Sequence, residues 1–429
     1  MRLWLGKLYI QVFIGIILGG LIGFVFPNFG TQLQPLADGF IKLIKMLLAP
    51  IIFGTVITGI AKMGNLKEVG RIGARALIYF EVASTFALAL GLIVVNVVRP
   101  GAGMNIDPAQ LDAKAISGYA RVAEAQPGLV GFLMDIIPTT IVDAFAKGAM
   151  LQIILLSVLL GLAAVQIGPK GRPFVEVMDS ALNVLFRVVG MVMRLAPLGA
   201  GAGVAFTIGK YGIGSLSSLA WLMASVYLTS ILFVVLVLGA VAAWSGFSLL
   251  KFISTFKDEI LITFGTCSTE AVMPQMMVKL ERLGCDKSVV GLVLPTGYTF
   301  NADGTCIYLT MAAIFVAQAT NTPLSWGDQL LVLGILLLTS KGSAGVAGAG
   351  FVTLAATLSS IHTVPVTGLV LLLGVDRLMN QPRAVVNLIG NGIATIAIAK
   401  WEGVFDRARA EAVYRGEPLP ALEGINLDH

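Results

Sequence analysis

The sequence predicts an all-α membrane protein with eight transmembrane helices, two re-entrant helical hairpins and internal inverted repeats. Of the 429 residues, 57% are hydrophobic and only 12% are charged, about half the charged fraction of a soluble globular domain. Residues 8–26, 219–244 and 351–374 contain no Asp, Glu, Lys or Arg, and about twenty such residues form a helix that crosses hydrocarbon. Two later apolar segments are interrupted by small or polar residues, a pattern typical of transporter sites.

The first 248 residues are predicted to form six spans. The first span is not followed by a small-residue cleavage site, so we expect a retained helix rather than a signal peptide. Residues 101–128 are polar and rich in alanine, and we expect an external loop there. The six spans are 8–27, 38–62, 76–98, 128–167 with a break at Pro138, 176–208 and 217–245.

Residues 249–283 and 325–362 are each predicted to form a hairpin of two short apolar arms. The tips are Gly-Thr-Cys-Ser-Thr-Glu at 265–270 and the small-residue run at 340–350. Neither arm is long enough to cross the bilayer. Irregular backbone is tolerated at membrane depth only where protein or a water-filled cavity surrounds it. We therefore expect re-entrant hairpins whose tips face each other.

Each hairpin is followed by a predicted span, 286–318 or 364–400. The first of these spans is broken at Asn301-Ala-Asp-Gly-Thr305. With the first hairpin entering from the cytoplasm and the second from outside, the hairpin-and-helix unit occurs twice with inverted topology. A site between two such repeats is expected near the middle of the membrane.

The net charge of +5 comes from basic residues in short loops between apolar segments. In this topology those loops fall on one side of the membrane, as the positive-inside rule requires. We therefore expect both termini in the cytoplasm, a location in the bacterial inner (cytoplasmic) membrane, and no nucleic-acid partner. The three cysteines, Cys267, Cys285 and Cys306, lack metal-ligand spacing, and no disulfide is expected.

The last span carries the sharpest polar signal. Its polar residues recur at intervals of four, three, four and four, which places them on one face of a helix. They are Asp376, Asn380, Arg383, Asn387 and Asn391. Charges at membrane depth are costly and usually mark the path of a substrate or ion, and arginine suits bidentate binding of a carboxylate. The alternative is an ion pair between Arg383 and Asp376 that only holds helices together.

The broken span indicates a cation site. Asp303 stands in an otherwise apolar segment, where Gly297 and Gly304 free the backbone. Unwound carbonyl groups beside one carboxylate suit a hard cation. The alternative is a helix kinked at glycine with a hydrogen-bonded aspartate. The two hairpin tips would offer backbone N–H groups to an anion.

Four motifs in this order resemble the dicarboxylate/amino acid:cation symporters, a family with the fold of the glutamate transporters. The motifs are Gly-Thr-Cys-Ser-Thr-Glu at 265–270, Pro-Thr-Gly-Tyr-Thr-Phe-Asn-Ala-Asp-Gly-Thr at 295–305, Gly-Val-Ala-Gly-Ala-Gly at 345–350 and Asp376-Arg-Leu-Met-Asn-Gln-Pro-Arg383-Ala-Val-Val-Asn387. The resemblance covers almost the whole chain. It is greatest to the bacterial aerobic C4-dicarboxylate transporters, including Tyr79-Phe-Glu-Val-Ala-Ser and residues 94–105.

The resemblance implies a homotrimer in the lipid bilayer that works as an elevator-type transporter. Residues 1–248 would hold helices 1 to 6, with helices 1, 2, 4 and 5 forming the scaffold and trimer contacts. Helices 3 and 6 would move with the transport domain. Residues 249–402 would form the transport core of hairpin 1, helix 7, hairpin 2 and helix 8, and residues 403–429 a cytoplasmic tail.

The resemblance also implies roles for individual residues. Arg383 would hold the distal carboxylate of a small dicarboxylate substrate. The other substrate-binding positions would be Asn387, Thr305, Ser268, Thr269, Val346, Gly350 and Asn380. Asn301, Asp303 and Gly297 would fall on the family's cation positions, with sodium at Asn301 and Asp303. The candidates for cation or proton coupling are Asp303, Asn301, Asp376, Gly297, Asn391, Ser84, Glu81 and Glu270.

Two departures from the family pattern bear on the substrate. Amino-acid carriers of this family have an Asp where Asn380 stands, which pairs with the substrate's ammonium group, and a Thr where Ala384 stands. The amide of Asn380 offers no charge to an amine. We therefore expect a dicarboxylate without an amino group, such as succinate, fumarate or malate. Sodium-coupled transport of dicarboxylates or of aspartate and glutamate is the alternative.

Further departures bear on the coupling ion. Sodium-coupled members have an Asp where Asn391 stands, and hydroxyl and aromatic ligands where Ala83 and Phe80 stand, which leaves only Ser84 in place. At least one sodium site is thus weakened, and proton coupling is the preferred hypothesis. The carboxylates that could bind a proton are Asp303, Asp376, Glu81 and Glu270. No cofactor is expected besides the coupling protons or sodium ions.

Two other classes of membrane protein fit the sequence less well. A channel needs repeated polar rings along a pore, whereas polarity here concentrates at one level. An intramembrane hydrolase that paired Cys267 with His362 would lack a third, orienting residue. We therefore expect no enzymatic activity and a structural role for His362. Lys341, near the second tip, is equally consistent with supplementing Arg383 and with extending to the membrane surface.

Overall fold

The structure, a computed structural model, is all-helical over the residues that it describes. These are residues 8–63, 66–108, 131, 134–211, 219–340, 349–361, 364–372, 375–415 and 417 of the 429-residue chain. Five helices in these ranges are long and apolar enough to cross a membrane, or six if one bent pair counts as a single span. The all-α class predicted from the sequence is confirmed.

The first three predicted spans correspond to long helices. The bounds are α2 (Leu8–Val25), α3 (Pro27–Gln32), α4 (Gln34–Met63) and α5 (Leu66–Val98). α5 begins ten residues before the predicted residue 76 because its charged first turns have partners. Arg71 and Arg75 form ion pairs of 2.7 and 2.8 Å with the buried carboxylate of Glu402 at the end of the last long helix.

The fourth predicted span is broken at the predicted Pro138, which lies in a non-helical stretch at residues 136–140. A second break, which was not predicted, lies at Gly148. Gly148 adopts a left-handed conformation (φ 62°) that ends one helix before the next begins, a role that glycine fills without steric cost. The two helices are α8 (Ile141–Lys147) and α9 (Met150–Gln166).

The predicted span at 176–208 is bent in the structure. α10 (Arg172–Met193) and α11 (Ala196–Tyr211) meet at a bend of 52°. Pro197 stands in the first turn of α11, where its missing N–H breaks the hydrogen-bond ladder from the preceding helix. The next predicted span consists of α13 (Ala220–Leu232), a π-helical turn (Phe233–Leu238) and α14 (Gly239–Trp244).

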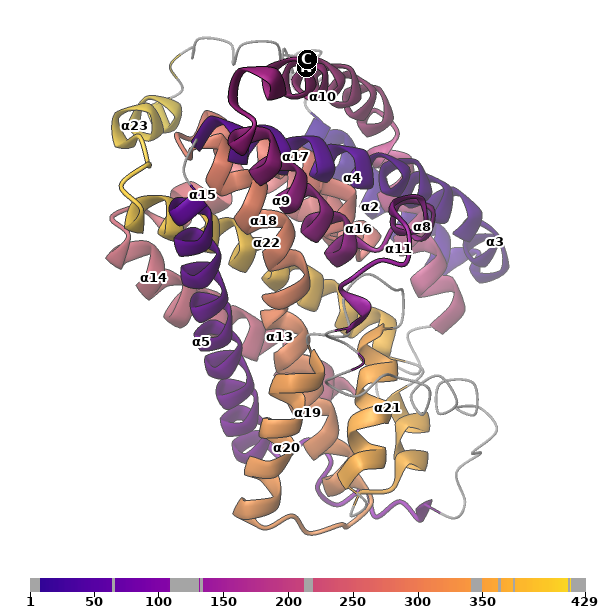
Figure 1. The fold of residues 1–429 in the computed structure, drawn as a ribbon. Helices are drawn as coiled ribbons and strands as arrows, with labels where there is room; N and C mark the ends of the chain where they lie inside the picture. The colour runs from indigo at the N-terminus through magenta and orange to yellow at the C-terminus, as the bar shows by residue number, and fades with distance from the viewer. Residues whose placement is uncertain are drawn as a thin grey trace.

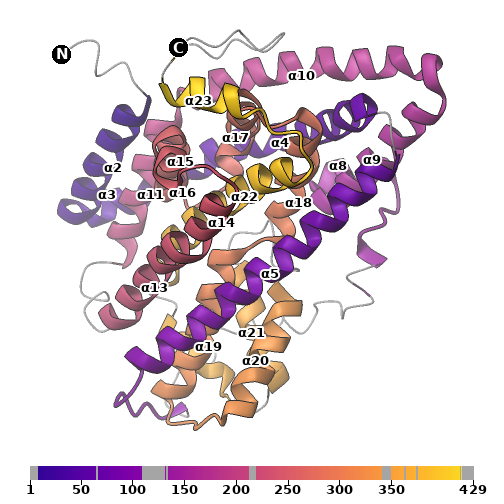
Figure 2. The same ribbon diagram turned by 90° about the vertical axis from the view of Figure 1, so that its left-hand side faces the viewer.

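The remaining helices follow the predicted order of hairpin, broken span, hairpin and span. They are α15 (Leu249–Thr255), α16 (Lys257–Thr266), α17 (Met273–Arg282), α18 (Lys287–Phe300), α19 (Asp303–Ala319), α20 (Trp326–Thr339), α21 (Ala349–Ile361), α22 (Asp376–Trp401) and α23 (Arg407–Arg415), with 3-10 turns at Glu270–Val272 and Val366–Leu372. α22 begins later than the predicted residue 364 because the 3-10 turn precedes it. α20 and α21 lie beside α19, and α16 and α17 lie toward the other end of the molecule (Figures 1 and 2).

A buried ion pair ties the two arms of the first hairpin together. Lys279 on α17 contacts the carboxylate of Glu259 on α16 at 2.8 Å, and Glu259 is buried. The same ammonium group donates to the carbonyl oxygen of Thr255 at 3.1 Å. A buried charge needs such partners, because an unpaired one is strongly destabilising.

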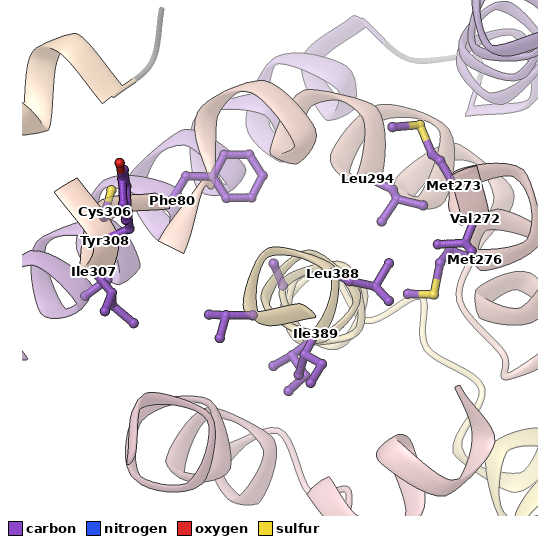
Figure 3. Packing of buried hydrophobic residues seen from close by; sticks show 14 of the residues in the cluster. Phe80, Val272, Met273, Met276, Leu294, Cys306, Ile307, Tyr308, Leu388 and Ile389 are labelled. Atoms are coloured by element: carbon purple, nitrogen blue, oxygen red, sulfur yellow. The ribbon is translucent and has the colours of Figure 1, made fainter. Parts of the chain in front are cut away.

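α22 forms the centre of the apolar core that positions the polar residues. Figure 3 shows Leu388 on the side of α22 that faces Leu294 of α18 and Met276 of α17, and Phe80 and Tyr308 on the opposite side. All five residues belong to one continuous cluster of buried side chains. α22 therefore packs against the first hairpin and both halves of the broken span, which fixes its polar face among them.

Close packing of small residues joins α2 to α11, which Figure 2 shows side by side. On α2, glycines recur every four residues, and on α11 small residues and one proline do the same. The two series are Gly15, Gly19 and Gly23, and Pro197, Gly201 and Ala205. Without Cβ atoms the helix backbones approach each other closely, as in other membrane helix pairs.

We expect Gly19→Ala to destabilise the protein by about 1–3 kcal/mol, the usual cost of overpacking. A Cβ at Gly19 would collide with the carbonyl oxygen of Gly201. Gly20→Ala is the matched control, because a Cβ there meets only side chains at ordinary van der Waals distances, Ile208 at 3.6 Å and Val204 at 3.9 Å. Thermal unfolding in detergent measures both. Equal melting temperatures for the two variants would contradict the proposed contact.

Candidate functional site

The polar site begins where α18 ends and α19 begins, at Asn301 and Ala302. The chain leaves the helix at Asn301 (φ −113°, ψ 67°), whose N–H still donates to the carbonyl oxygen of Gly297 at 2.7 Å. α19 then starts at Asp303, so a carboxylate occupies its first turn. A negative charge is favoured there by the helix dipole. The predicted break of this span is therefore present.

Asn301, Asp303 and Asn391 form one buried cluster. The Nδ2 amide of Asn301 donates to Oδ2 of Asp303 at 3.2 Å and to Oδ1 of Asn391 at 3.1 Å. Asn301 and Asp303 are 0% exposed. A Cβ at Gly297 would collide with Asn391, and one at Gly390 would collide with Asp303, so both glycines permit the close approach.

This cluster is rich in oxygen atoms. Oδ1 of Asn301 has no hydrogen-bond partner among the described residues. Carboxylate and amide oxygens are ligands of hard cations, and a carboxylate can bind a proton instead. Within the described ranges, no group of three or more His, Cys, Asp and Glu side chains gathers to hold a metal ion.

Asn387 links the broken span to α22. Its Oδ1 accepts a hydrogen bond of 2.8 Å from the N–H of Gly304, and its Nδ2 donates to the hydroxyl of Thr305 at 3.2 Å. An amide group in the first turn of α19 thus finds its partner on another helix. A Cβ at Gly304 would collide with the backbone of Arg383, so glycine is needed for this approach.

Arg383 lies one helical turn before Asn387 and is 6% exposed. Its Nε donates to Oδ1 of Asn380 at 2.7 Å, and its guanidinium carbon stands 4.7 Å from the centre of the Tyr308 ring. Nη1 has no hydrogen-bond partner among the described residues. A buried, unsatisfied donor of a charged group is costly, so this arrangement suits an anion.

The alternative role of Arg383, an ion pair with Asp376, is not seen. Within the described residues no ion pair of 4.0 Å or less joins these two side chains. Asp376 is half-buried, and its Oδ1 lacks a hydrogen-bond partner in the same part of the chain. Among the described residues, the guanidinium contacts a neutral amide and an aromatic ring, and none of them pairs with its charge.

The tip of the first hairpin reaches the same region. Ser268 and Thr269 are half-buried, and the carbonyl oxygen of Cys267 accepts from Nδ2 of Asn380 at 3.4 Å. Glu270 is buried and accepts a hydrogen bond from the hydroxyl of Tyr298 on α18. The tip therefore contacts both α22 and α18.

The second hairpin approaches the arginine through Gly350, which is buried. A Cβ there would collide with Nη1 of Arg383, so the start of α21 lies against the guanidinium. Val346, Lys341 and His362 lie outside the described residues.

The residues of α5 fall into two groups. Phe80 and Ser84 are buried, and the ring of Phe80 lies against Gly297 of the broken span. Ala83 is buried too. Glu81 is exposed on the other face of α5. The structure thus places Phe80 beside the broken span, buries Ala83 and Ser84, and leaves Glu81 exposed.

Three contacts of the site were not foreseen from the sequence. The Tyr308 ring faces Arg383, the Tyr298 hydroxyl binds Glu270, and the Cys267 carbonyl accepts from Asn380. Tyr298 belongs to a motif that carries the family resemblance, which was a usable signal. No signal in the sequence indicated the role of the Cys267 carbonyl, because every residue has a backbone carbonyl group.

Comparison with known proteins identifies relatives along nearly the whole chain. Residues 8–401 match the model of the sodium:dicarboxylate symporter family. A C4-dicarboxylate transport protein of Anaeromyxobacter sp. (strain K) is 56% identical over 420 residues, which are 98% of this chain and 95% of that protein. C4-dicarboxylate transport protein 3 of Ralstonia nicotianae is 57% identical over 98% of this chain and 94% of its own length. The C4-dicarboxylate transport protein of Yersinia enterocolitica is 55% identical over 97% of each chain.

We expect Asn391→Leu to destabilise the protein by about 1–3 kcal/mol, the cost of leaving a buried polar group without its partner. The change keeps the branching of the side chain at Cγ but removes the oxygen that accepts from Asn301. Thermal unfolding in detergent measures the effect. Thr395→Val, one turn along α22, is the control, because the Thr395 hydroxyl bonds only to the carbonyl oxygen of Asn391 in its own helix. A loss no larger than that of the control would show that the cluster does not support the fold.

Proposed function

Because this chain belongs to the sodium:dicarboxylate symporter family, we propose that it imports C4-dicarboxylates such as succinate, fumarate or malate together with cations. The family consists of symporters, and the relatives are named transport proteins. The chain is therefore a multi-pass membrane transporter and not an enzyme. The substrate leaves the protein chemically unchanged.

The Nη1 group of Arg383, which has no hydrogen-bond partner among the described residues, carries this proposal. It is the buried donor of a full positive charge, and it lies where Gly350 of the second hairpin meets α22. Two parallel N–H···O bonds from a guanidinium match a carboxylate in geometry and charge. One carboxylate of the substrate binds there. Asn387, Thr305, Ser268 and Thr269 line the rest of the site.

The neutral amide of Asn380 favours a dicarboxylate over an amino acid. An ammonium group beside Arg383 would need a carboxylate to offset two positive charges, and Asn380 does not supply one. A dianion without an amino group meets no such penalty. The names of the relatives, which are C4-dicarboxylate transport proteins, support the same substrate class.

Cations must accompany the dianion. At least two positive charges neutralise it, and each further inward charge gains about 2.3 kcal/mol per 100 mV of membrane potential. Protons are the preferred coupling ions because Asn391, Ala83 and Phe80 replace sodium ligands of the family. Asp303, Asp376, Glu81 and Glu270 stay predictions as proton carriers. Sodium is the second candidate, favoured by the buried oxygens of Asn301 and Asp303.

The elevator mechanism belongs to the same proposal. Residues 249–402, with α5 and α13–α14, would move as the transport domain of each subunit in a homotrimer of eight-span chains. Both termini would lie in the cytoplasm, and the bacterial inner membrane would house the protein. One contact between α11 of the scaffold and α16 of the first hairpin supports movement. Ala200, Gly203 and Gly265 meet there without large side chains, so the surfaces offer little resistance to sliding.

We expect Arg383→Ala to weaken succinate binding by about 2 kcal/mol or more, roughly a thirtyfold loss, because a charged partner of the substrate disappears. Equilibrium binding of labelled succinate to the purified protein measures the change. Arg194→Ala is the control, because Arg194 is exposed between α10 and α11. Undiminished affinity in Arg383→Ala would remove the arginine from the substrate site and the proposal with it.

A second prediction concerns the coupling ion. In proteoliposomes free of sodium, an inward proton gradient should drive uptake of labelled succinate, and collapse of that gradient should stop it. Aspartate should be taken up far more slowly. Succinate uptake that requires sodium at constant pH would overturn the preference for protons. Aspartate uptake exceeding succinate uptake would overturn the substrate assignment.

A further inference from the structure

Asn380 stands between the arginine and the tip of the first hairpin. Its Oδ1 accepts from Nε of Arg383 at 2.7 Å, and its Nδ2 donates to the carbonyl oxygen of Cys267 at 3.4 Å. One side chain thus contacts the group that would bind the substrate and the loop that would cover it. The first hydrogen bond is short and charge-assisted, the second is longer and weaker.

The amide of Asn380 makes both contacts because it carries both an acceptor and a donor. An amide oxygen accepts and an amide nitrogen donates, whereas an ionised carboxylate only accepts. An Asp at this position would keep the bond to Arg383 but would place a negative charge against the Cys267 carbonyl. Cys267 is in the left-handed conformation (φ 55°) that ends α16, so its carbonyl oxygen leaves the helix direction. A non-glycine residue in this conformation is uncommon and strained.

The bond to Asn380 also decides how the arginine is presented. A guanidinium binds a carboxylate through Nε and one terminal nitrogen, or through both terminal nitrogens. The Nε–H of Arg383 already donates to Asn380, and the Tyr308 ring lies against the guanidinium face. The terminal nitrogens remain for the substrate, and Nη1 faces Gly350. The carboxylate must therefore approach end-on, between α22 and the second hairpin.

We propose that Asn380 is a positioning residue, which holds Arg383 in its end-on orientation and couples it to the tip of the first hairpin, instead of itself holding the substrate. This inference rests on the proposed function, because it assumes that Arg383 binds the carboxylate. Departure of the first tip would remove the Cys267 carbonyl, loosen Asn380 and weaken the hold on the substrate. Opening of the hairpin and release of the anion would then be linked through one amide.

The first measurement is equilibrium binding of labelled succinate to the full-length protein in detergent. Asn380→Ala should weaken binding about tenfold or more, as expected for loss of a hydrogen bond to a charged group. Asn380→Asp should weaken binding further, because its carboxylate neutralises Arg383 even though it keeps the Nε bond. Gln381→Ala is the matched control. Gln381 is the next residue on α22, is buried whereas Asn380 is half-buried, and bonds to Tyr227 rather than to Arg383.

The second measurement uses Cys267 as a reporter of the hairpin tip. Cys267 is partly accessible, while Cys285 and Cys306 are buried. Asn380→Ala and Asn380→Asp should both speed the reaction of Cys267 with a maleimide in the absence of substrate, because the tip loses its contact. Arg383→Ala should also speed the labelling of Cys267, because the Nε group that orients the Asn380 amide is then absent. The double variant should react no faster than the faster single variant, because both changes break one chain of contacts. Cys267→Ser identifies the background signal.

The outcomes separate the two proposals. Retained succinate affinity in Arg383→Ala would overturn the proposed function itself. Loss of affinity in Arg383→Ala with full affinity in both Asn380 variants would overturn only the positioning role. Weakened affinity with an unchanged rate of Cys267 labelling would overturn the coupling to the hairpin. Asn380→Asp is nearly isosteric, so it keeps the test decisive if Asn380→Ala fails to fold.

Discussion

The burial of Arg383 is the constraint on which the rest of the site depends. Placing an arginine in the middle of a membrane costs about 2.5–3.5 kcal/mol on insertion scales. The hydrogen bond to Asn380 returns about 1.5–3 kcal/mol, and the Tyr308 ring about 0.5–2 kcal/mol. These neutral partners offset the cost without neutralising the charge. An aspartate at the same distance would stabilise the arginine more but would leave nothing to attract an anion.

Two neighbouring segments contact Arg383 closely because each has a glycine at the point of contact. Gly304 lies against the backbone of Arg383, and Gly350 lies against its guanidinium. A Cβ at either position would collide with the arginine, so these two glycines are required by close approach. The broken span and the second hairpin therefore meet α22 at the same turn. Glycine at these two positions therefore allows the broken span, the second hairpin and α22 to contribute to one site.

The sequence predicted the polar face of the last span and the break at Asn301, because both depend on local patterns. A period of about 3.6 residues puts Asn380, Arg383 and Asn387 on one face whatever surrounds the helix. The bend between α10 and α11, the second break at Gly148 and the start of α22 at Asp376 were not foreseen. Those features depend on caps and on packing against distant segments. The Tyr308 and Cys267 contacts with α22 likewise depend on tertiary structure, which no local pattern encodes.

The order of polar residues on α22 offers a physical basis for coupling an anion to cations. Arg383 and Asn391 are eight residues apart, a rise of about 12 Å along the helix. Asn387 lies between them and holds the N–H of Gly304, next to Asp303 of the oxygen-rich cluster. In the proposed mechanism, an anion at the arginine would contact the start of α19 from one side, and a proton or cation at Asp303 would act on the same turn from the other. Each charge would then stabilise the site for the opposite charge, so binding of one would favour binding of the other.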